Sequence, residues 1–539
     1  MSVLLNQYFC SVFTPENQDI PIPQDIIAER QIEALSTVNF SPAEVIKYID
    51  KLKVTKSPGP DQIHPRILKE TKNEIAEHLS NIFTQSLENG TCPSQWKEAN
   101  VTPIFKEGDK KCPGNYRPIS LTSVIGKLME SLITDKITEF LETNKLIGDS
   151  QHGFRHNRSC LTNLLLFFKN IIEIHDAKSP IDIIYLDFQK AFDKVPHRRL
   201  VSKLHSIGIR GELNNWIKCW LTDRRQRVVL NGSSSPWGNV TSGVPQGSVL
   251  GPVLFIIFIN DLDINVLSNI SKFADDTKLG GKVQTEHDCH QIQSDLNKIV
   301  DWSEKWQMKF NVDKCKVMHI GHHNPKHEYS MSGKKLIPVT EERDLGVIIS
   351  NDLKSSKQCN DAAKKGNKML GMISRTISFK SRDSILKLYN AFVRPHLEYS
   401  VQFWSPYLRK DIIKLEMVQR RATKLIPSLR NKSYEDRLRE LNLYSLEKRR
   451  VRGDMIEVWK IMKGKENVNR ASLFTLNANE VTRNNGYKIV GKRFSLDITR
   501  NFFTYRVVEE WNKLPAEVVN SDTIVTFKSR LDKFYQNRP

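Results

Sequence analysis

The sequence predicts an α+β protein built from two or three domains. The chain has 539 residues, which is long for a single hydrophobic core. Its composition, with 39% hydrophobic and 26% charged residues, is that of a globular protein. Residues 57–350 mix short β-branched runs with helical patterns, whereas residues 351–539 show mainly helical periodicity.

The elements divide into three consecutive regions. Residues 1–56 are predicted to form a helical N-terminal extension. This extension ends at KSPGPDQIHP (56–65), because its Pro-Gly-Pro run cannot continue a helix. Residues 57–350 form the mixed region, and residues 351–539 form a basic helical region in which weaker order is expected around NANEVTRNNG (477–486).

The positive charge is concentrated in the third region. The formal net charge is +20. Residues 351–539 hold 39 Lys and Arg against 20 Asp and Glu, a net of +19, whereas residues 1–350 hold 42 against 41, a net of +1. For one basic helix alone, a solvated face is the favoured interpretation. Because helical stretches such as EMVQRRATKLI (416–426) repeat the pattern, nucleic acid is the expected partner.

Membrane and disulfide classes are not indicated by the sequence. The longest apolar run, VLFIIFI (253–259), is far too short to span a bilayer, and the N-terminus has no basic segment of the secretory type. Eight cysteines are scattered without a CxxC pair, which is typical of reduced thiols. We therefore expect an intracellular protein of the nucleus or cytoplasm, or both, with no membrane partner.

Three aspartates are the candidates for chemistry in the mixed region. In IDIIYLDFQKAFDKV (181–195), residues 183–186 have the length and branching of a buried strand, and Asp187 lies where it ends. In KFADDTKL (272–279), Asp275 and Asp276 are expected in the tight turn of a β-hairpin. The three carboxylates would converge only if the two strands are neighbours in one sheet.

A cluster of this kind would suit magnesium. Mg²⁺ prefers one or two carboxylates together with water and phosphate oxygens. Two ions about 3.5 to 4 Å apart would polarise an attacking hydroxyl and neutralise a leaving pyrophosphate; Mn²⁺ is the expected substitute. An Asp-Asp pair is also good turn chemistry, and from this pair alone that alternative stays open.

The surrounding motifs resemble those of a known family. IYLDFQKAFDKVPH (184–197), GVPQGSVLGPVLFIIFINDL (243–262) and FADDTKL (273–279) resemble, in this order, the three palm motifs of reverse transcriptases. Further stretches are similar to the enzymes of non-LTR (LINE) retrotransposons, particularly the jockey-like group: KSPGPDQIHPRIL, VTPIFKEGDKKCPGNYRPISLTSVIGKLME, QHGFRHNRSCLTNLLL, ERDLGVIIS, VRPHLEYSVQFWSP and LEMVQRRATKLIPSLRNKSYEDRL.

The resemblance implies a fold and a reaction. The fold would be a right-hand polymerase with an antiparallel-sheet palm, mixed fingers, a helical thumb and a basic helical C-terminal region. The reaction would be RNA-directed addition of dNTPs to the 3′-end of a DNA primer by two-metal phosphoryl transfer. The partners would be an RNA template, a DNA primer or target and dNTPs, and the oligomeric state is left open.

Site residues follow from the motifs one by one. Asp187 and Asp275 would be metal ligands, with the backbone carbonyl of Phe188 and the adjacent Asp276 completing the set, and Asp193 would be structural. Residues of the nucleotide site would be Lys106 and Arg117 for the triphosphate, Phe192 as the aromatic gate against a 2′-hydroxyl, and Gln246 with Gly247 close to nucleotide or template.

Two further assignments are less specific. In DWSEKWQMKFNVDKCKVMHIG (301–321), Lys314 would be the general acid that protonates pyrophosphate, with Lys309 and Lys316 as near alternatives. RHNRSC (155–160) resembles a turn that touches the template, with Ser159 as a helix N-cap; capping alone is an equally good interpretation.

Other sites and other protein classes are alternatives to the reverse-transcriptase interpretation. The histidines and cysteines of two stretches, 287–290 and 315–327, lack finger spacing, so no zinc site is expected. A catalytically silent nucleic-acid-binding remnant of such an element is the main alternative, followed by a group II intron or retron polymerase and a viral RNA polymerase. Because the chain begins just before the polymerase region, we expect no upstream endonuclease and no nicking of its own target.

Overall fold

The computed structural model describes residues 1–23, 32–477 and 485–536. It is a mixed structure of helices and strands, divided into two compact units whose segments alternate along the chain. Unit 1 contains residues 1–154, 186–266 and 295–314; unit 2 contains residues 155–185, 267–294 and 315–539. The three predicted regions are continuous instead, and their boundaries stay a prediction. Most of the segment predicted to be weakly ordered, residues 478–484, lies outside the described residues.

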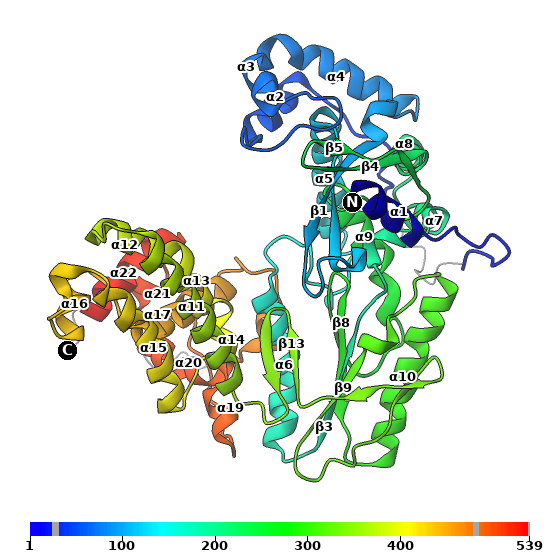
Figure 1. Cartoon of the computed structure of the whole chain (residues 1–539). Helices are drawn as coiled ribbons and strands as arrows, with labels where there is room; N and C mark the ends of the chain where they lie inside the picture. The colour runs from blue at the N-terminus through cyan, green and yellow to red at the C-terminus, as the bar shows by residue number, and fades with distance from the viewer. Residues whose placement is uncertain (24–31, 478–484, 537–539) are drawn as a thin grey trace. The chain divides into compact units, whose positions relative to one another are not determined.

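Unit 1 combines a small sheet with helices (Figure 1). Its helices are α1 (Ser2–Val12), α2 (Pro42–Lys51), α3 (Pro65–Glu70), α4 (Lys72–Glu88), α5 (Val124–Thr143), α7 (His197–Ser206), α8 (Gly211–Leu221) and α9 (Gly251–Phe258). Its strands are β1 (Glu98–Phe105), β2 (Tyr116–Leu121), β4 (Arg224–Leu230), β5 (Ser233–Ser234) and β6 (Gly238–Val240).

The unit 1 sheet has the order β2-β1-β4-β5, with β6 also paired to β4. Strands β1 and β2 form an antiparallel hairpin, and β1 runs parallel to β4. Helix α1 packs on this sheet through a core cluster of four buried residues: Leu5, Phe9, Val101 and Val228. Within residues 1–56, the structure thus has two helices, α1 and α2, while residues 24–31 lie outside the described ranges.

The unit 2 sheet has the order β12-β9-β3-β8-β7. Its strands are β3 (Ile181–Leu186), β7 (Asn269–Phe273), β8 (Asp276–Lys282), β9 (Lys316–Ile320) and β12 (Ile337–Pro338). Pairs β3–β9 and β7–β8 are antiparallel, as predicted, whereas the short strand β12 runs parallel to β9. Two small hairpins follow, β10 (Ser330–Met331) with β11 (Lys334–Lys335), and β13 (Glu341–Asp344) with β14 (Val347–Ser350).

Helices surround this sheet and form the C-terminal part of unit 2. Helix α6 (Cys160–Asp176) packs against β7 and β8, and α10 (Glu286–Lys305) carries the chain from unit 2 into unit 1. The later helices are α11 (Ser356–Thr376), α12 (Arg382–Leu388), α13 (Arg394–Glu398), α14 (Val401–Trp404), α15 (Arg409–Lys424), α16 (Tyr434–Glu440), α17 (Leu446–Met462), α18 (Arg470–Leu473), α19 (Asp497–Asn501), α20 (Phe503–Asn512), α21 (Ala516–Val519) and α22 (Ile524–Gln536). The prediction of a helical C-terminal region is confirmed.

One apolar core joins the parts of unit 2. It contains Phe167 and Phe168 of α6, Ile183 of β3, and buried side chains of α11, α15, α17, α20 and α22, among them Trp459 and Trp511. Within the described ranges, every helix is too short or too polar to cross a bilayer. All eight cysteines lie in described segments and are free thiols, as the sequence predicts.

Candidate active site

Asp187 lies where a buried strand ends. Ile183 and Ile184 of β3 are completely buried, because both faces of this central strand are covered, and β-branched residues suit that position. The strand ends at Leu186, and the carbonyl of Asp187 then accepts a hydrogen bond from the Asn311 amide at 2.7 Å. The predicted strand with a terminal carboxylate is confirmed.

Asp275 and Asp276 lie at the tip of a hairpin. Phe273 pairs with Asp276 in the β7–β8 register, so the loop consists of Ala274 and Asp275 alone. Ala274 has a φ of 54°, the positive value that two-residue hairpin loops require at this position. Asp276 is the first residue of β8, and β8 is the hydrogen-bonded neighbour of β3. The predicted hairpin is confirmed, although Asp276 belongs to the strand and not to the turn, and the condition that the two strands be neighbours in one sheet is met.

The chemistry of these side chains fits a hard divalent cation. Among the residues that the structure describes, no three His, Cys, Asp or Glu side chains gather as a ready-made metal cluster. Mg²⁺ does not need one, since one or two carboxylates with phosphate and water oxygens suffice. Asp187 is already paired with a cation, because Lys314 Nζ lies 3.7 Å from its Oδ2.

Of the three lysines considered as general acid, Lys314 is the one paired with Asp187. Its side chain is 62% exposed, which leaves it free to move towards a substrate. Lys316, two residues on, pairs instead with Glu342 at 2.9 Å. Lys309 contributes its backbone carbonyl to the Gln189 amide. The geometry therefore favours Lys314 among these three, although its role stays a prediction.

The segment containing Gln246 packs tightly against Phe192 and Asp193. Gln246 Nε2 donates to Asp193 Oδ1 at 3.0 Å, and the amide of Val244 donates to the Phe192 carbonyl at 2.7 Å. Gly247 has a φ of 120°, and a Cβ there would lie 2.5 Å from the Ser120 carbonyl oxygen. A side chain at 247 would therefore clash with the Ser120 backbone, so this position requires glycine. That Gly247 lies close to nucleotide or template stays a prediction.

The pKa of the Asp193 carboxyl is shifted by its surroundings. Burial raises it to about 6, while the Gln246 hydrogen bond and the charge of Lys190 lower it. The Phe192 ring lies flat on Phe255, with centroids 4.6 Å apart, and edge-on to Phe154 at 6.1 Å. Aromatic contacts on two sides fix the orientation of Phe192.

Lys106 and Arg117 lie on one face of the β1–β2 hairpin. Arg117 pairs with Ile104 in the register, and the Lys106 amide donates to the Asn115 carbonyl at 2.9 Å, which extends the ladder by one step. Since side chains alternate along a strand, Lys106 and Arg117 point to the same side. Both are exposed, and together they present an ammonium and a guanidinium suited to phosphate oxygens.

Lys190 was not predicted as a site residue. It has a left-handed backbone, with a φ of 49°, and its half-buried ammonium lies 5.7 Å from the Tyr8 ring centroid. Burial lowers the pKa of Lys190, Asp193 opposes this, and Lys314, Lys106 and Arg117 lower it further. The only sequence signal was its place in LDFQKAFD, between Asp187 and Asp193.

Glu130 is a second residue that the motifs did not reveal. This α5 carboxylate is 1% exposed, and it accepts hydrogen bonds from the Val249 amide at 2.7 Å, the Leu250 amide at 3.3 Å and Trp220 Nε1 at 3.2 Å. Both amides belong to the turn that follows Gly247. Glu130 therefore anchors the chain between the Gln246 motif and α9, whose run VLFIIFI is buried.

The RHNRSC turn precedes α6, and its predicted cap is present. Ser159 Oγ accepts from the Thr162 amide at 3.2 Å, and Thr162 Oγ1 accepts from the Ser159 amide at 2.9 Å. This reciprocal capping box confirms Ser159 as the N-cap of α6. Contact of this turn with a template stays a prediction.

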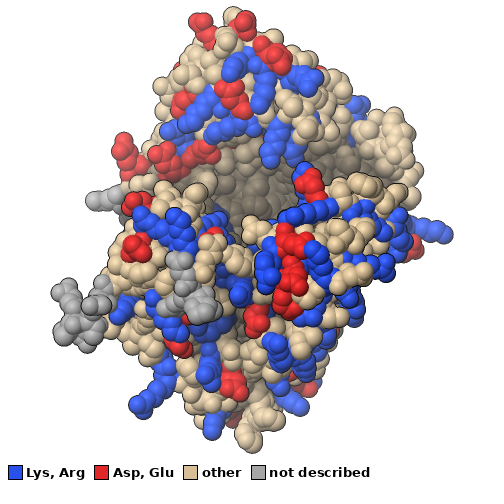
Figure 2. Space-filling model, turned by 90° about the vertical axis from the view of Figure 1, so that its left-hand side faces the viewer, with Lys and Arg blue, Asp and Glu red and all other residues tan. Residues whose placement is uncertain are grey.

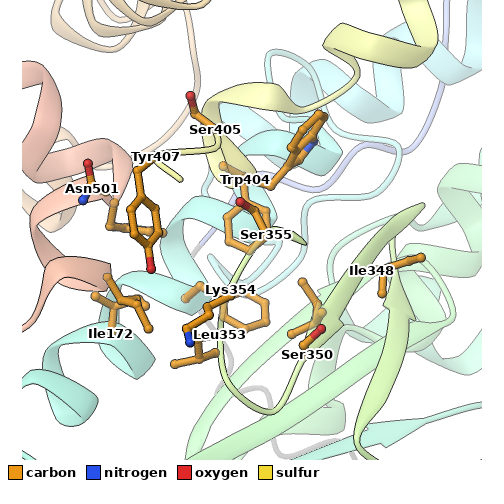
Figure 3. A pocket seen from close by; sticks show the side chains of 15 residues that line it. Ile172, Ile348, Ser350, Leu353, Lys354, Ser355, Trp404, Ser405, Tyr407 and Asn501 are labelled. Atoms are coloured by element: carbon orange, nitrogen blue, oxygen red, sulfur yellow. The ribbon is translucent and has the colours of Figure 1, made fainter. Parts of the chain in front are cut away.

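Unit 2 also has a pocket away from the predicted site residues. A pocket lined by Trp404, Tyr407, Lys354, Ser350 and Asn501, among others, lies beside α6 and contains none of the predicted site residues (Figure 3). Figure 2 shows Lys and Arg side chains spread over the face that it views, with Asp and Glu side chains between them.

Comparisons with known proteins agree with the motifs. The sequence model of a family described as reverse transcriptase (RNA-dependent DNA polymerase) matches residues 104–373, half of the chain. The chain is 27% identical to a probable RNA-directed DNA polymerase from transposon X-element of Drosophila melanogaster, over 76% of this chain and 46% of that protein. It is also 27% identical to the RNA-directed DNA polymerase from mobile element jockey of the same fly, over 71% of this chain and 43% of that protein. The chain thus spans less than half the length of these relatives.

Proposed function

Because the chain belongs to the reverse transcriptase (RNA-dependent DNA polymerase) family, we propose that it adds deoxynucleotides to a primer 3′-end on an RNA template, as part of the machinery of a jockey-like non-LTR retrotransposon. The observation that carries the proposal is the sheet order: β3, which leads into Asp187, is the neighbour of β8, which begins at Asp276. Its proposed partners are an RNA template, a DNA primer or target and dNTPs.

Asp187, Asp275 and Asp276 would hold the metal ions, with the Phe188 carbonyl as a further ligand. Two bound Mg²⁺ ions, or Mn²⁺ in their place, would supply charge neutralisation for the attacking hydroxyl and the leaving pyrophosphate. The support from this chain is the donor set of exposed and half-exposed carboxylates at strand ends, where phosphate oxygens and water can complete the coordination.

The nucleotide would be held by residues of unit 1. Lys106 and Arg117, on one face of the β1–β2 hairpin, would bind the triphosphate. Lys190, whose charge interacts with both, would add a third cation. Phe192 would lie beneath the sugar as the gate against a 2′-hydroxyl, and Gln246 with Gly247 would lie next to the nucleotide or template. Lys314 would move from Asp187 to donate a proton to the leaving pyrophosphate.

The parts of the fold would correspond to the palm, fingers and thumb of a polymerase. The sheet β9-β3-β8-β7 would be the palm, the β1–β2 hairpin with its helices would belong to the fingers, and the helices after β14 would form the thumb and the basic C-terminal region. The support for the last assignment is the net charge of +19 over residues 351–539, which suits phosphate binding.

Primer extension tests the proposal. The purified chain, given poly(rA) annealed to oligo(dT), dTTP and Mg²⁺, is expected to lengthen the primer, and removal of the metal with EDTA is expected to stop it. An electrophoretic mobility assay with the same RNA is the matched measurement of binding. If the chain binds the RNA but extends no primer in Mg²⁺ or Mn²⁺, the proposed polymerase activity is contradicted. The alternative, a catalytically silent nucleic-acid-binding remnant, would then be favoured.

A further inference from the structure

A buried ion pair lies next to the Asp275–Asp276 turn within unit 2. Lys278, two residues after Asp276, points to the same face of β8 because side chains alternate. Its Nζ lies 2.5 Å from Oδ2 of Asp344, the last residue of β13. The side chains of Lys278 and Asp344 are only 4% and 6% exposed, whereas Asp276 is exposed.

Lys278 is buried against aromatic rings of the core. Its ammonium lies 5.1 Å and 5.5 Å from the ring centroids of Phe167 and Phe168 of α6, within the range of cation–π attraction. Burial lowers the pKa of Lys278, and the carboxylates of Asp344 and Asp276 oppose that effect. A well-packed apolar pair is often as stable at such a position as two buried charges. The pair therefore calls for an explanation other than stability.

A second ion pair fixes the same hairpin. Glu342 lies two residues before Asp344 and so on the same face of β13, and it pairs with Lys316 of β9 at 2.9 Å. The turn of the hairpin is also held, because Tyr399 donates from its hydroxyl to the Leu345 carbonyl at 3.0 Å. The β13–β14 hairpin is thus fastened to β8 and β9, the two strands that flank β3.

We propose that Lys278 and Asp344 are positioning residues for the metal-binding turn: the two charges of their ion pair set the electrostatic potential at Asp276. The inference rests on the proposed function, because it assumes that Asp275 and Asp276 bind the metal. Lys278 reduces the negative potential at the turn, and Asp344 holds the ammonium in place and offsets part of its charge.

This arrangement predicts opposite effects for the two single variants. Lys278→Met removes a positive charge beside Asp276, so the affinity for a divalent cation is expected to rise. Asp344→Asn removes the counter-charge and leaves the ammonium, so the affinity is expected to fall. A role in packing alone would weaken metal binding in both variants, because each would loosen the start of β8.

Electron paramagnetic resonance of free Mn²⁺ measures this binding without requiring catalysis. We expect the Mn²⁺ dissociation constant to decrease by about threefold or more in Lys278→Met and to increase by about threefold or more in Asp344→Asn, as one nearby charge produces. The double variant Lys278→Met, Asp344→Leu removes both charges and is expected to return to within about twofold of the parent.

An exposed ion pair of the same unit provides the matched control. Lys335 and Glu328 are paired at 2.5 Å with side chains 73% and 72% exposed, and Lys335→Met and Glu328→Gln are expected to leave Mn²⁺ binding unchanged. Circular dichroism checks that each variant folds, and the double variant keeps the test open should a single one fail to fold. Shifts in the same direction for both single variants, or a double variant that does not return towards the parent, would overturn the positioning role.

The proposed function has a separate indicator in the same titration. If Asp275→Ala, Asp276→Ala binds Mn²⁺ as the parent does, the turn is not the metal site and the proposed function fails at its premise. If that variant loses binding while the Lys278 and Asp344 variants do not shift, only the positioning role is contradicted.

Discussion

Phe192, the proposed gate against a 2′-hydroxyl, is held by ring contacts on two sides. Its ring is stacked on Phe255 and meets Phe154 edge-on, so it has little freedom to rotate. The sequence motif predicted the residue, whereas its rigidity comes from partners far apart in the chain that no local pattern reveals.

Replacement of this ring is expected to relax sugar selection. In Phe192→Ala, the ratio of kcat/KM for dTTP to that for UTP should fall by about tenfold or more, because the steric clash with a 2′-hydroxyl is lost. Phe192→Tyr keeps the ring and should keep the ratio. Steady-state incorporation on an RNA template measures both, and an unchanged ratio in the alanine variant would remove the gate assignment.

Asp193 gives a stability prediction with a defined pH dependence. Its folded pKa of about 6 lies above the ordinary value of 3.8, so folding favours the protonated form. This contribution is complete below pH 4 and is lost as the pH rises through 6. Asp193→Asn should therefore gain stability relative to the parent as the pH rises from 4 to 7, by roughly 1–2 kcal/mol. Thermal melts at pH 4.5 and 7.5 measure it; an equal difference at both would contradict it.

At the scale of elements, short-range patterns were sufficient to predict the two strands next to the candidate aspartates. The β-branched run before Asp187 and the hairpin around Asp275 each follow from local residues, and both were predicted, with the turn placed one residue too far along the chain. The buried side chains that hold these segments, Glu130 and Lys278, were not predictable. They meet their partners only through tertiary contacts, at sequence separations of 119 and 66. Lys190 lacked a pattern because a left-handed backbone, with a φ of 49°, is not expected of a lysine from local sequence.

The anchoring of α9 by Glu130 yields a prediction at this scale. Glu130→Gln should destabilise the protein by about 2–4 kcal/mol, because the buried amides of Val249 and Leu250 lose a charged acceptor. Glu139 lies on the same helix with a side chain 69% exposed, and Glu139→Gln should change stability by less than about 0.5 kcal/mol. Urea unfolding of the two variants gives the comparison; similar values would show that the anchor is unimportant.

At the scale of the whole molecule, the net charge differs sharply between two parts of the sequence. Residues 1–350 are nearly neutral and contain every predicted site residue, whereas residues 351–539 carry a net charge of +19. This division was evident from the sequence. The sequence did not reveal that each compact unit is assembled from three separate segments, because that depends on strand order and not on composition.

The salt dependence of RNA binding tests the role of the C-terminal charge. Four exposed lysines on the neighbouring helices α11 and α15 are suitable for neutralisation to Gln: Lys364, Lys368, Lys410 and Lys424. If they contact phosphates, the slope of log K against log salt should become shallower by about two to three. A matched variant neutralises four exposed lysines of unit 1, namely Lys47, Lys51, Lys53 and Lys136. Equal slopes for the two variants would place the RNA elsewhere.

The most direct test of the account is primer extension by an Asp275→Ala, Asp276→Ala variant on poly(rA)/oligo(dT) with Mg²⁺ and dTTP. Its matched control, Glu509→Ala, Glu510→Ala, removes two adjacent acids from α20 in the same unit. Extension is expected by the parent and the control and not by the Asp275, Asp276 variant, with RNA binding preserved in all three. Extension by that variant at the rate of the parent would contradict the assignment of the active site.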